Sequence, residues 1–322
     1  MSPSPKRSPS REDRVAAGVE ELSRFLVDLL RQGLAGASSA GYRSFDEMAS
    51  RMVDAQAPGL ARRVRDLGTL CHDSSSPRDL LLDRIGRLHL LLEAYRRIDR
   101  LPPDLAADVR ALVGFTTRRE SVLALPCVQD TWWTLGRRLE VQDDLSTSRA
   151  WLWGERSGRF GLILSFSAAG RPFDIGPAPG SVLEGKAHFY PSAVPLRAIL
   201  DPEGPPRRAH GTKPASHHPL EQAWDQMLDC HARLPWLDRF PMALQSVVPV
   251  RDGERWVLRS EALILPMAPF GQDGWDLLAV SGGHPVDVFG EWNGASLAPL
   301  ACSAGDAHYT LGRNPMFREV EG

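Results

Sequence analysis

The stretch SPRDLLLDRIGRLHLLLEAY, residues 76–95, predicts a long helix with one apolar face. Ser76 stands three residues before Asp79, and this spacing lets the hydroxyl and the carboxylate satisfy amide groups at a helix start. Pro77 between them suits the first helical position. The large apolar residues recur at three- and four-residue steps, as one helix face requires: Leu81, Ile85, Leu88, Leu92 and Tyr95.

Start signals of the same kind precede other helical patterns on both sides of this stretch. They are the pairs Ser10 with Asp13, Ser44 with Glu47, and Thr117 with Glu120. Pro58-Gly59 is expected either to kink or to break the helix that follows Ser44. Gly114 is placed to end a short helix over Pro103–Val113. These patterns predict an antiparallel-type helical bundle over residues 12–126, after a disordered Ser/Pro-rich tail at residues 1–11.

After Pro126 the pattern changes to short runs rich in aromatic and β-branched residues, which are typical of strands. The runs are Thr131–Val141, Arg149–Gly154, Phe160–Phe166 and Val182–Phe189. In the second run Trp151 and Trp153 share one face of the strand, and Leu152 lies on the other. Four such runs in succession predict an antiparallel β-meander over residues 127–200.

The remaining sequence predicts a linker followed by a mixed region. Residues 201–218, DPEGPPRRAHGTKPASHH, contain prolines and glycines without periodicity, which indicates an exposed linker or loop. A helix is expected over Pro219–Leu234, and turn signals follow at Asp252-Gly253, Asp273-Gly274 and Asn293-Gly294. Residues 219–322 are therefore predicted as a C-terminal helix with β-hairpins. The predicted fold class is α+β, with a helical bundle, an antiparallel β region and a mixed α/β region.

The composition bounds the compartment and the partners. The net charge of −2 argues against a dedicated nucleic-acid or membrane-surface protein, because both usually need a basic excess. The four cysteines are widely spaced without a C-x-x-C pair, and the Ser/Pro-rich start does not read as a signal peptide. No run approaches the ~18–20 apolar residues of a membrane span. We expect a soluble cytoplasmic protein without membrane contact.

Motifs for catalysis, cofactors and metals are incomplete. His217-His218 and Cys230-His231 contain metal-ligand types but lack the spacing of a zinc site. Ser281-Gly282-Gly283-His284 lacks the G-x-S-x-G pattern of a nucleophile elbow, and a turn is favoured there. No phosphate-binding loop or dinucleotide fingerprint is found. The sequence predicts no catalytic residue, metal or cofactor, and an enzyme with a site assembled from distant residues remains an alternative.

Two residue sets are candidates for an interaction surface. The first could form a basic stripe for nucleic acid, although an ordinary solvated helix face is favoured: Arg51, Arg62, Arg63 and Arg65. The second could face a protein partner, although packing of the sheet is favoured: Trp132, Trp151 and Trp153.

Five stretches together resemble a known family: RMVDAQAPGLARRVRDL at Arg51–Leu67, LLLEAYRRIDRLPPDLAADVRALVGF at Leu90–Phe115, RAWLWGERSGRFGLILSFSAAGRP at Arg149–Pro172, FYPSAVPLRAIL at Phe189–Leu200 and SGGHPVDVFGEWNG at Ser281–Gly294. Over about Val15 to Leu300 the chain resembles the region downstream of the zinc finger in bacterial SWIM zinc-finger family proteins. The blocks from Asp54 to Gly59 and from Trp151 to Phe166 are the most distinctive parts.

The resemblance implies a cytoplasmic bacterial protein encoded beside a MoxR-type AAA+ ATPase and a von Willebrand factor A-domain protein. The family's finger, a C-x-C pair followed by C-x-H, has no counterpart in this sequence, so its zinc and its contacts are not implied here. A finger on another chain, a shortened member and a finger outside the given sequence remain open. The predicted function is a non-enzymatic interaction or adaptor module in a multi-protein assembly. Nucleic-acid association through the arginine stripe and an unrecognised enzyme are the alternatives.

Overall fold

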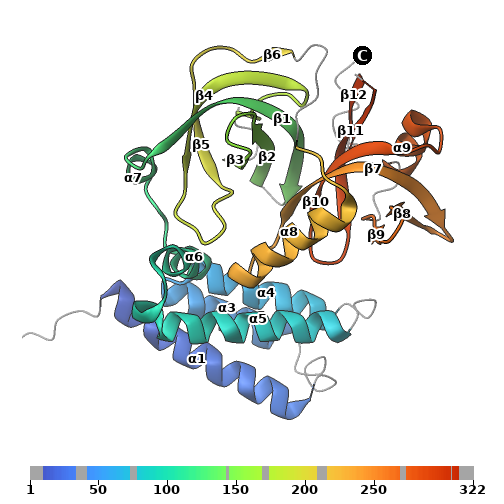
Figure 1. Ribbon diagram of the computed structural model, residues 1–322. Helices are drawn as coiled ribbons and strands as arrows, with labels where there is room; N and C mark the ends of the chain where they lie inside the picture. The colour runs from blue at the N-terminus through green and yellow to red at the C-terminus, as the bar shows by residue number, and fades with distance from the viewer. Residues whose placement is uncertain are drawn as a thin grey trace, which may run out of the picture. The chain divides into compact units, whose positions relative to one another are not determined.

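The computed structural model describes residues 10–33, 42–72, 78–142, 145–168, 174–208, 216–268, 273–305 and 307–311. The chain divides into two compact units, Met1–Arg118 with Pro191–Ala193, and Arg119–Tyr190 with Val194–Gly322. The first unit is helical, and the second is built mainly from antiparallel strands (Figure 1). The predicted α+β fold class is confirmed.

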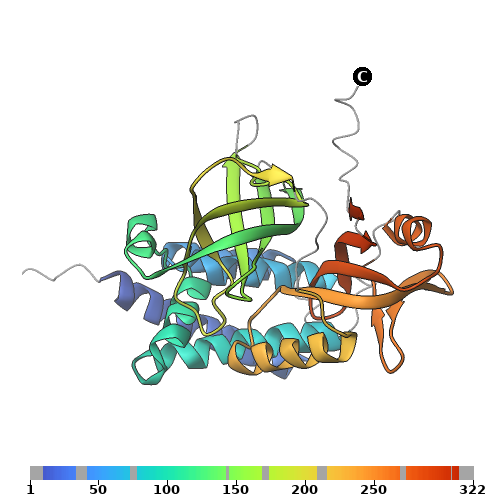
Figure 2. The same ribbon diagram turned by 45° about the horizontal axis from the view of Figure 1, so that its top comes forward.

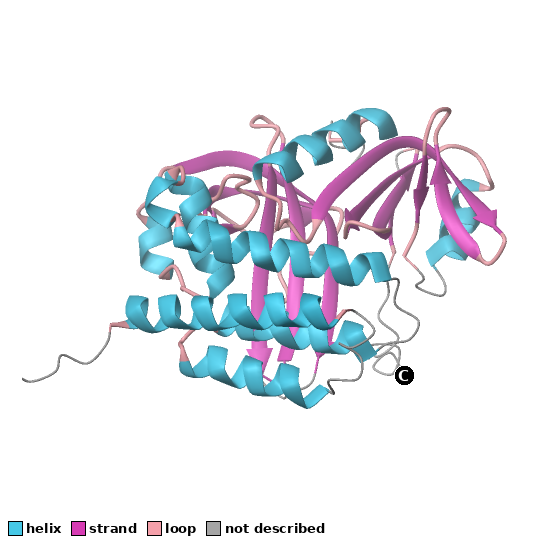
Figure 3. Ribbon diagram, turned by 90° about the horizontal axis from the view of Figure 1, so that it is seen from below, coloured by secondary structure: helices cyan, strands magenta, loops and turns pink. Residues whose placement is uncertain are grey.

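The helical unit buries the apolar faces that the sequence predicts. Figures 1 and 3 show its helices running side by side. Val15, Val19 and Leu22 on the first helix are at most 1% exposed. The described helices are α1 (Arg11–Gln32), α3 (Tyr42–Asp54), α4 (Pro58–His72), α5 (Arg78–Arg96) and α6 (Pro103–Val113), with a short 3₁₀ helix, η1, at Ile98–Arg100.

The helix start signals have different outcomes. At α1 the capping box is confirmed, because the Ser10 hydroxyl accepts from the Asp13 amide and the Asp13 carboxylate accepts from the Ser10 amide. The signal at Ser44 is wrong in position, since α3 already begins at Tyr42. Ser76 and Pro77 lie outside the described residues. Thr117 lies one position before the N-cap of α7 (Arg119–Leu123), a short helix of the second unit.

The helical pattern is fully broken before Pro58-Gly59, and these two residues begin the second helix. The helix α3 ends at Asp54 and α4 begins at Pro58, with Gln56 between them at a φ of 62°. Gly59 is required for packing as well, because a Cβ there would lie 2.1 Å from the carbonyl oxygen of Leu112 on α6. The distinctive Asp54–Gly59 block therefore has a structural role: it lets α4 cross close to α6.

The second unit opens with a sheet of strands β1 (Cys127–Gln142), β2 (Leu145–Gly154), β3 (Phe160–Ala168), β4 (Ser181–Phe189), β5 (Ala198–Pro202) and β6 (Arg207–Arg208). Its order is β3-β2-β1-β4-β5, with β6 also pairing with β4. The predicted meander is correct for β1 to β3 only, because β4 pairs with β1 instead of β3. Two of these strands, β5 and β6, fall partly or wholly in residues 201–208, which the sequence assigns to a linker.

This first sheet curls toward closure (Figure 2). The amide of Leu162 on β3 donates to the carbonyl oxygen of Leu196 at 2.7 Å, just before β5, so the two ends of the sheet meet. Trp132, Leu152 and Leu183 form part of the core on one face of the sheet. Trp151 and Trp153 belong to a different core from Leu152, which confirms the predicted alternation along β2.

The second sheet has the order β12-β11-β10-β7-β8-β9. Its strands are β7 (Phe240–Asp252), β8 (Arg255–Arg259), β9 (Ile264–Pro266), β10 (Val286–Trp292), β11 (Leu297–Ala304) and β12 (Ala307–Thr310), and its helices are α8 (Leu220–Arg233) and α9 (Asp273–Ser281). Residues of α8 and α9, such as Met227 and Leu277, pack with strand residues such as Leu244 in one core.

Two of the three predicted hairpin turns are confirmed. Asp252-Gly253 joins β7 to β8, and Asn293-Gly294 joins β10 to β11. The prediction at Asp273-Gly274 is wrong, because these residues begin α9. Aspartate also favours a helix start, and a Cβ at position 274 would lie 2.3 Å from Trp256, so packing explains this glycine.

Candidate binding site

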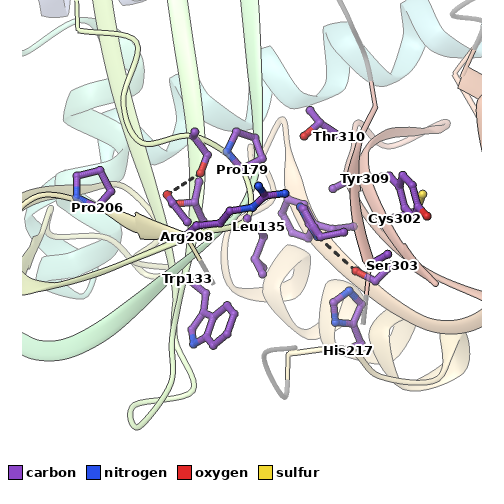
Figure 4. A pocket seen from close by; sticks show the side chains of 18 of the residues that line it. Trp133, Leu135, Pro179, Pro206, Arg208, His217, Cys302, Ser303, Tyr309 and Thr310 are labelled. Carbon is purple, nitrogen blue, oxygen red and sulfur yellow. Dashed lines mark hydrogen bonds between the residues drawn. The ribbon is translucent and has the colours of Figure 1, made fainter. Parts of the chain in front are cut away.

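A cavity of about 760 Å³ opens within the second unit, between strands of its two sheets. This volume lies in the range of ligand-binding pockets. From the first sheet it is lined by Trp133, Thr134 and Leu135 of β1 and by Arg207 and Arg208 of β6. From the second sheet it is lined by Ala301, Cys302 and Ser303 of β11 and by all four residues of β12. Figure 4 shows Arg208 extending from β6 toward the side of the cavity that carries Ser303 and Tyr309.

Strand pairing positions the basic side of the cavity. Arg208 pairs in register with Ser181 of β4, and Arg207 pairs with Val182. The Ser181 hydroxyl lies 3.2 Å from the hydroxyl of Thr134 and donates to the carbonyl oxygen of Ala178 at 2.6 Å. These contacts hold the turn before β4 against β1. The two arginines are therefore held at the cavity by backbone pairing.

The charged groups of the lining have one sign. Its described residues include Arg207, Arg208, His217 and His308 but no aspartate or glutamate. Arg207 lies 3.7 Å from the carboxylate of Glu184, which is outside the lining. Partial loss of hydration lowers the pKa of His308, so its imidazole is mainly neutral at pH 7. The two arginines keep their positive charge at any physiological pH, so the cavity suits an anionic group.

A serine and a histidine meet in the cavity without completing a catalytic arrangement among the described residues. The Ser303 hydroxyl lies 3.3 Å from Nδ1 of His308, slightly beyond the usual distance of a nucleophile and its base. No described lining residue is a carboxylate that could orient the imidazole. The geometry therefore favours binding over acyl transfer.

A buried ion-pair cluster joins the two sheets. Glu291 of β10, which is 0% exposed, accepts from Arg149 Nε at 3.0 Å and from the Trp151 indole at 2.7 Å, both on β2. Arg149 also donates to both carboxylate oxygens of Glu140 at 2.7 Å. These bonds lower the pKa of Glu140 to about 2. Arg149 and Glu291 are satisfied by each other and by their neighbours, which indicates a structural role.

The predicted tryptophan surface is not present on this fold. Trp132 and Trp151 are 0% exposed and Trp153 is 8% exposed. Trp132 packs in the core of the first sheet, while Trp153 meets Phe160 edge-on with ring centroids 4.7 Å apart. Their neighbour Trp133 is the tryptophan that lines the cavity. Burial of the indoles in the two sheet cores explains the difference, and the favoured packing interpretation is correct.

The predicted arginine stripe lies on helices of the first unit. Arg51 on α3 pairs with Glu21 of α1, and Arg63 on α4 is partly buried. Arg62 and Arg65 on α4 are exposed. Over residues 10–113 the arginines are matched by an equal number of acidic residues, so this region has no net charge. The structure therefore does not bring the four arginines into one unpaired stripe.

Residues of the family-like stretch Leu90–Phe115 form a polar cluster with the start of α1. The Tyr95 hydroxyl donates to Glu12 at 2.9 Å, and burial together with this bond raises the pKa of Tyr95 to about 12. Arg110 donates to the same carboxylate at 2.6 Å and stacks on Phe115, which Arg11 also covers. The cluster fastens the start of α1 to α5 and α6, so these residues support the fold.

The weaker chemical motifs separate in space. The His218 backbone pairs with Ala243 and Gln245 of β7, while His217 lines the cavity. Cys230 is half-buried on α8, and burial raises the pKa of its thiol. Ser281 ends α9 ahead of two glycines with positive φ, which confirms the turn. Among the described residues, no group of three or more His, Cys, Asp or Glu side chains could hold a metal ion.

The cavity residues carry little signal in the sequence. Arg207 and Arg208 lie in the stretch predicted as a linker, and the Pro-Pro-Arg-Arg run is their local signal. Ser181, Ser303 and His308 carry no motif. Their juxtaposition depends on pairing between distant strands.

The fold and the cavity define an α+β protein with a helical unit and a two-sheet unit that contains a cavity with two arginines in its lining. Residues 10–113 match the family model of the SWIM-associated four-helix bundle domain. No curated protein and no solved structure matches the chain significantly. In the described parts of the chain, no helix combines the length and apolar character needed to cross a bilayer.

Proposed function

We propose that this protein is a non-enzymatic interaction or adaptor module of a bacterial cytoplasmic assembly. In this proposal it is a SWIM-family protein that lacks the zinc finger in the given sequence. Its partners are a MoxR-type AAA+ ATPase and a von Willebrand factor A-domain protein, as the resemblance implies. The match of residues 10–113 to a SWIM-associated domain supports the family part of the proposal.

The observation that carries the binding role is the basic cavity beside a strand at the edge of its sheet. It combines Arg207 and Arg208 with an apolar floor that includes Leu135 and Phe289. Binding sites typically combine apolar walls with a few charged groups that select the ligand. Because the described lining holds no carboxylate, the site resembles a receptor for an anionic group more than a centre for acid–base chemistry.

The balance of charge in the helical unit weighs against nucleic acid as the main partner. Binding to a phosphate backbone needs several cationic side chains free to replace counterions. Arg96 is instead paired with Glu20 and Glu93, and Arg51 with Glu21. We therefore place protein partners first.

The test is reconstitution of the full chain with each purified partner, followed by size-exclusion chromatography with light scattering. The expected result is a complex of fixed stoichiometry with at least one of the two partners, with and without ATP. A chain that elutes alone at concentrations up to about 100 µM would refute the adaptor role with these partners. Titration with DNA and RNA at low salt is the parallel arm, and tight, steeply salt-dependent binding there would favour the nucleic-acid alternative.

A further inference from the structure

Strand β12 forms one edge of its sheet, and no other described strand pairs with it on the side away from β11. It is the terminal strand among the described residues, and its neighbour is β11. The amide of Leu311, which directly follows β12, donates to the carbonyl oxygen of Leu300 at 2.9 Å. Since successive residues of an antiparallel strand alternate between the two sides, the amides of His308 and Thr310 point away from β11. This edge can therefore accept a further strand.

The cavity runs along this edge. All four residues of β12 line it, and each of them is exposed. Successive side chains of a strand point to opposite faces, so a cavity on one face of the sheet would contact only every second residue. Contact with four consecutive residues indicates that the cavity lies beside the edge of the strand. An extended segment of four residues would cover about 13 Å here, the length of β12 itself.

The opposite wall of the cavity selects for negative charge. Arg207 and Arg208 project from β6, and both are exposed. His308 lies on β12 itself, and no described lining residue is acidic. If a further strand paired with the edge of β12, every second side chain of that strand would point toward this wall.

We propose that the cavity receives an extended acidic peptide segment of a protein partner. The segment adds to β12 as a strand, pairing with the backbone of His308 and Thr310, and directs its carboxylates to Arg207 and Arg208. The backbone edge supplies affinity without regard to side chains, and the arginines supply the preference for acidic residues. This inference rests on the proposed interaction role and assigns its binding site.

The test measures binding of a labelled, end-blocked peptide of about six residues that alternates valine and glutamate, by fluorescence polarisation with the full chain. The comparison probe replaces each glutamate with lysine. We expect the acidic peptide to bind at least about tenfold more tightly than the basic one, and salt to weaken its binding.

Two variants separate the charge from the strand edge. R207E/R208E reverses the charge of the cavity wall, and R255E/R259E makes the same change on exposed positions of β8 that do not line the cavity. Thr310→Pro removes an amide that points away from β11, so pairing with β11 is retained. We expect R207E/R208E and Thr310→Pro each to weaken binding about tenfold or more, and R255E/R259E to leave it unchanged. Urea unfolding checks that each variant is folded.

Several results would overturn the proposal. Equal binding of the acidic and basic peptides would remove the charge selection, and unchanged binding to Thr310→Pro would remove the added strand. Equally tight binding of free glutamate would assign the cavity to a small anion. Self-association that R207E/R208E abolishes would assign it to a second copy of the chain. If R207E/R208E still assembles with the AAA+ ATPase like the wild type, the adaptor role stands and this site for it fails. If the peptide binds but neither proposed partner assembles with the chain, the peptide site stands and the adaptor role with these partners fails.

Discussion

A comparison of two buried tryptophans tests the interpretation of the ion-pair cluster between the sheets. Trp151 and Trp133 belong to the same core and are 0% and 8% exposed. The indole of Trp151 donates to Glu291 at 2.7 Å. The indole nitrogen of Trp133 is shielded from solvent and has no hydrogen-bond partner among the described residues. Replacing each with phenylalanine removes the same atoms from the same core.

The structure predicts opposite electrostatic consequences for the two substitutions. A hydrogen bond to a charged group contributes about 1.5–3 kcal/mol, and Trp151→Phe loses it. An unsatisfied buried donor costs about 1–3 kcal/mol, and Trp133→Phe removes that cost. The loss of ring volume is similar in both. We therefore expect Trp151→Phe to be less stable than Trp133→Phe by about 4 kcal/mol in the free energy of unfolding.

The assay is urea unfolding followed by far-ultraviolet circular dichroism, because both substitutions change the tryptophan fluorescence. Similar slopes of the free energy against urea would show that the two variants expose similar surface on unfolding. The two sites also differ in that Trp133 lines the cavity, which lowers the packing cost of Trp133→Phe and acts in the same direction. Equal losses of stability would therefore refute the reasoning. A larger loss for Trp133→Phe would refute it as well.

Three further predictions follow from other sites. Gly59→Ala should destabilise the helical unit strongly, because the new Cβ would lie 2.1 Å from the Leu112 carbonyl oxygen. Gly86→Ala, at an open position of α5, should stabilise the unit by about 0.5–1 kcal/mol through helix propensity. Thermal unfolding of both variants distinguishes the effect of packing from that of helix propensity. Ser10→Ala should cost about 1 kcal/mol through loss of the α1 cap, and urea unfolding showing no loss would contradict the capping box. The pKa of Glu140 is about 2 in the folded state and 4.5 for an ordinary glutamate, so its contribution to folding stability is present above about pH 4.5 and is lost as the pH falls toward 2. In acid unfolding, Glu140→Gln should therefore lose less stability over that pH range than the wild type. Parallel curves of stability against pH would count against the ion pair with Arg149.

The sequence by itself determined the local elements of this protein. The three- and four-residue apolar spacing marked the helices of the first unit, and the alternation of Trp151, Leu152 and Trp153 marked the two faces of β2. The Ser10 capping box and the Asn293-Gly294 turn were also readable. These features depend on neighbours within a few residues, so a linear pattern contains the information that specifies them.

Tertiary structure decided how those elements pair and what they bring together. Nothing local indicates that β4 pairs with β1 instead of β3, because strand order depends on long-range packing. The same holds for Asp273-Gly274, where contact with Trp256 accompanies a helix start in place of a turn. The cavity is the extreme case: Arg208 and His308 stand one hundred positions apart in the chain and meet in its lining only through pairing with β4 and β11.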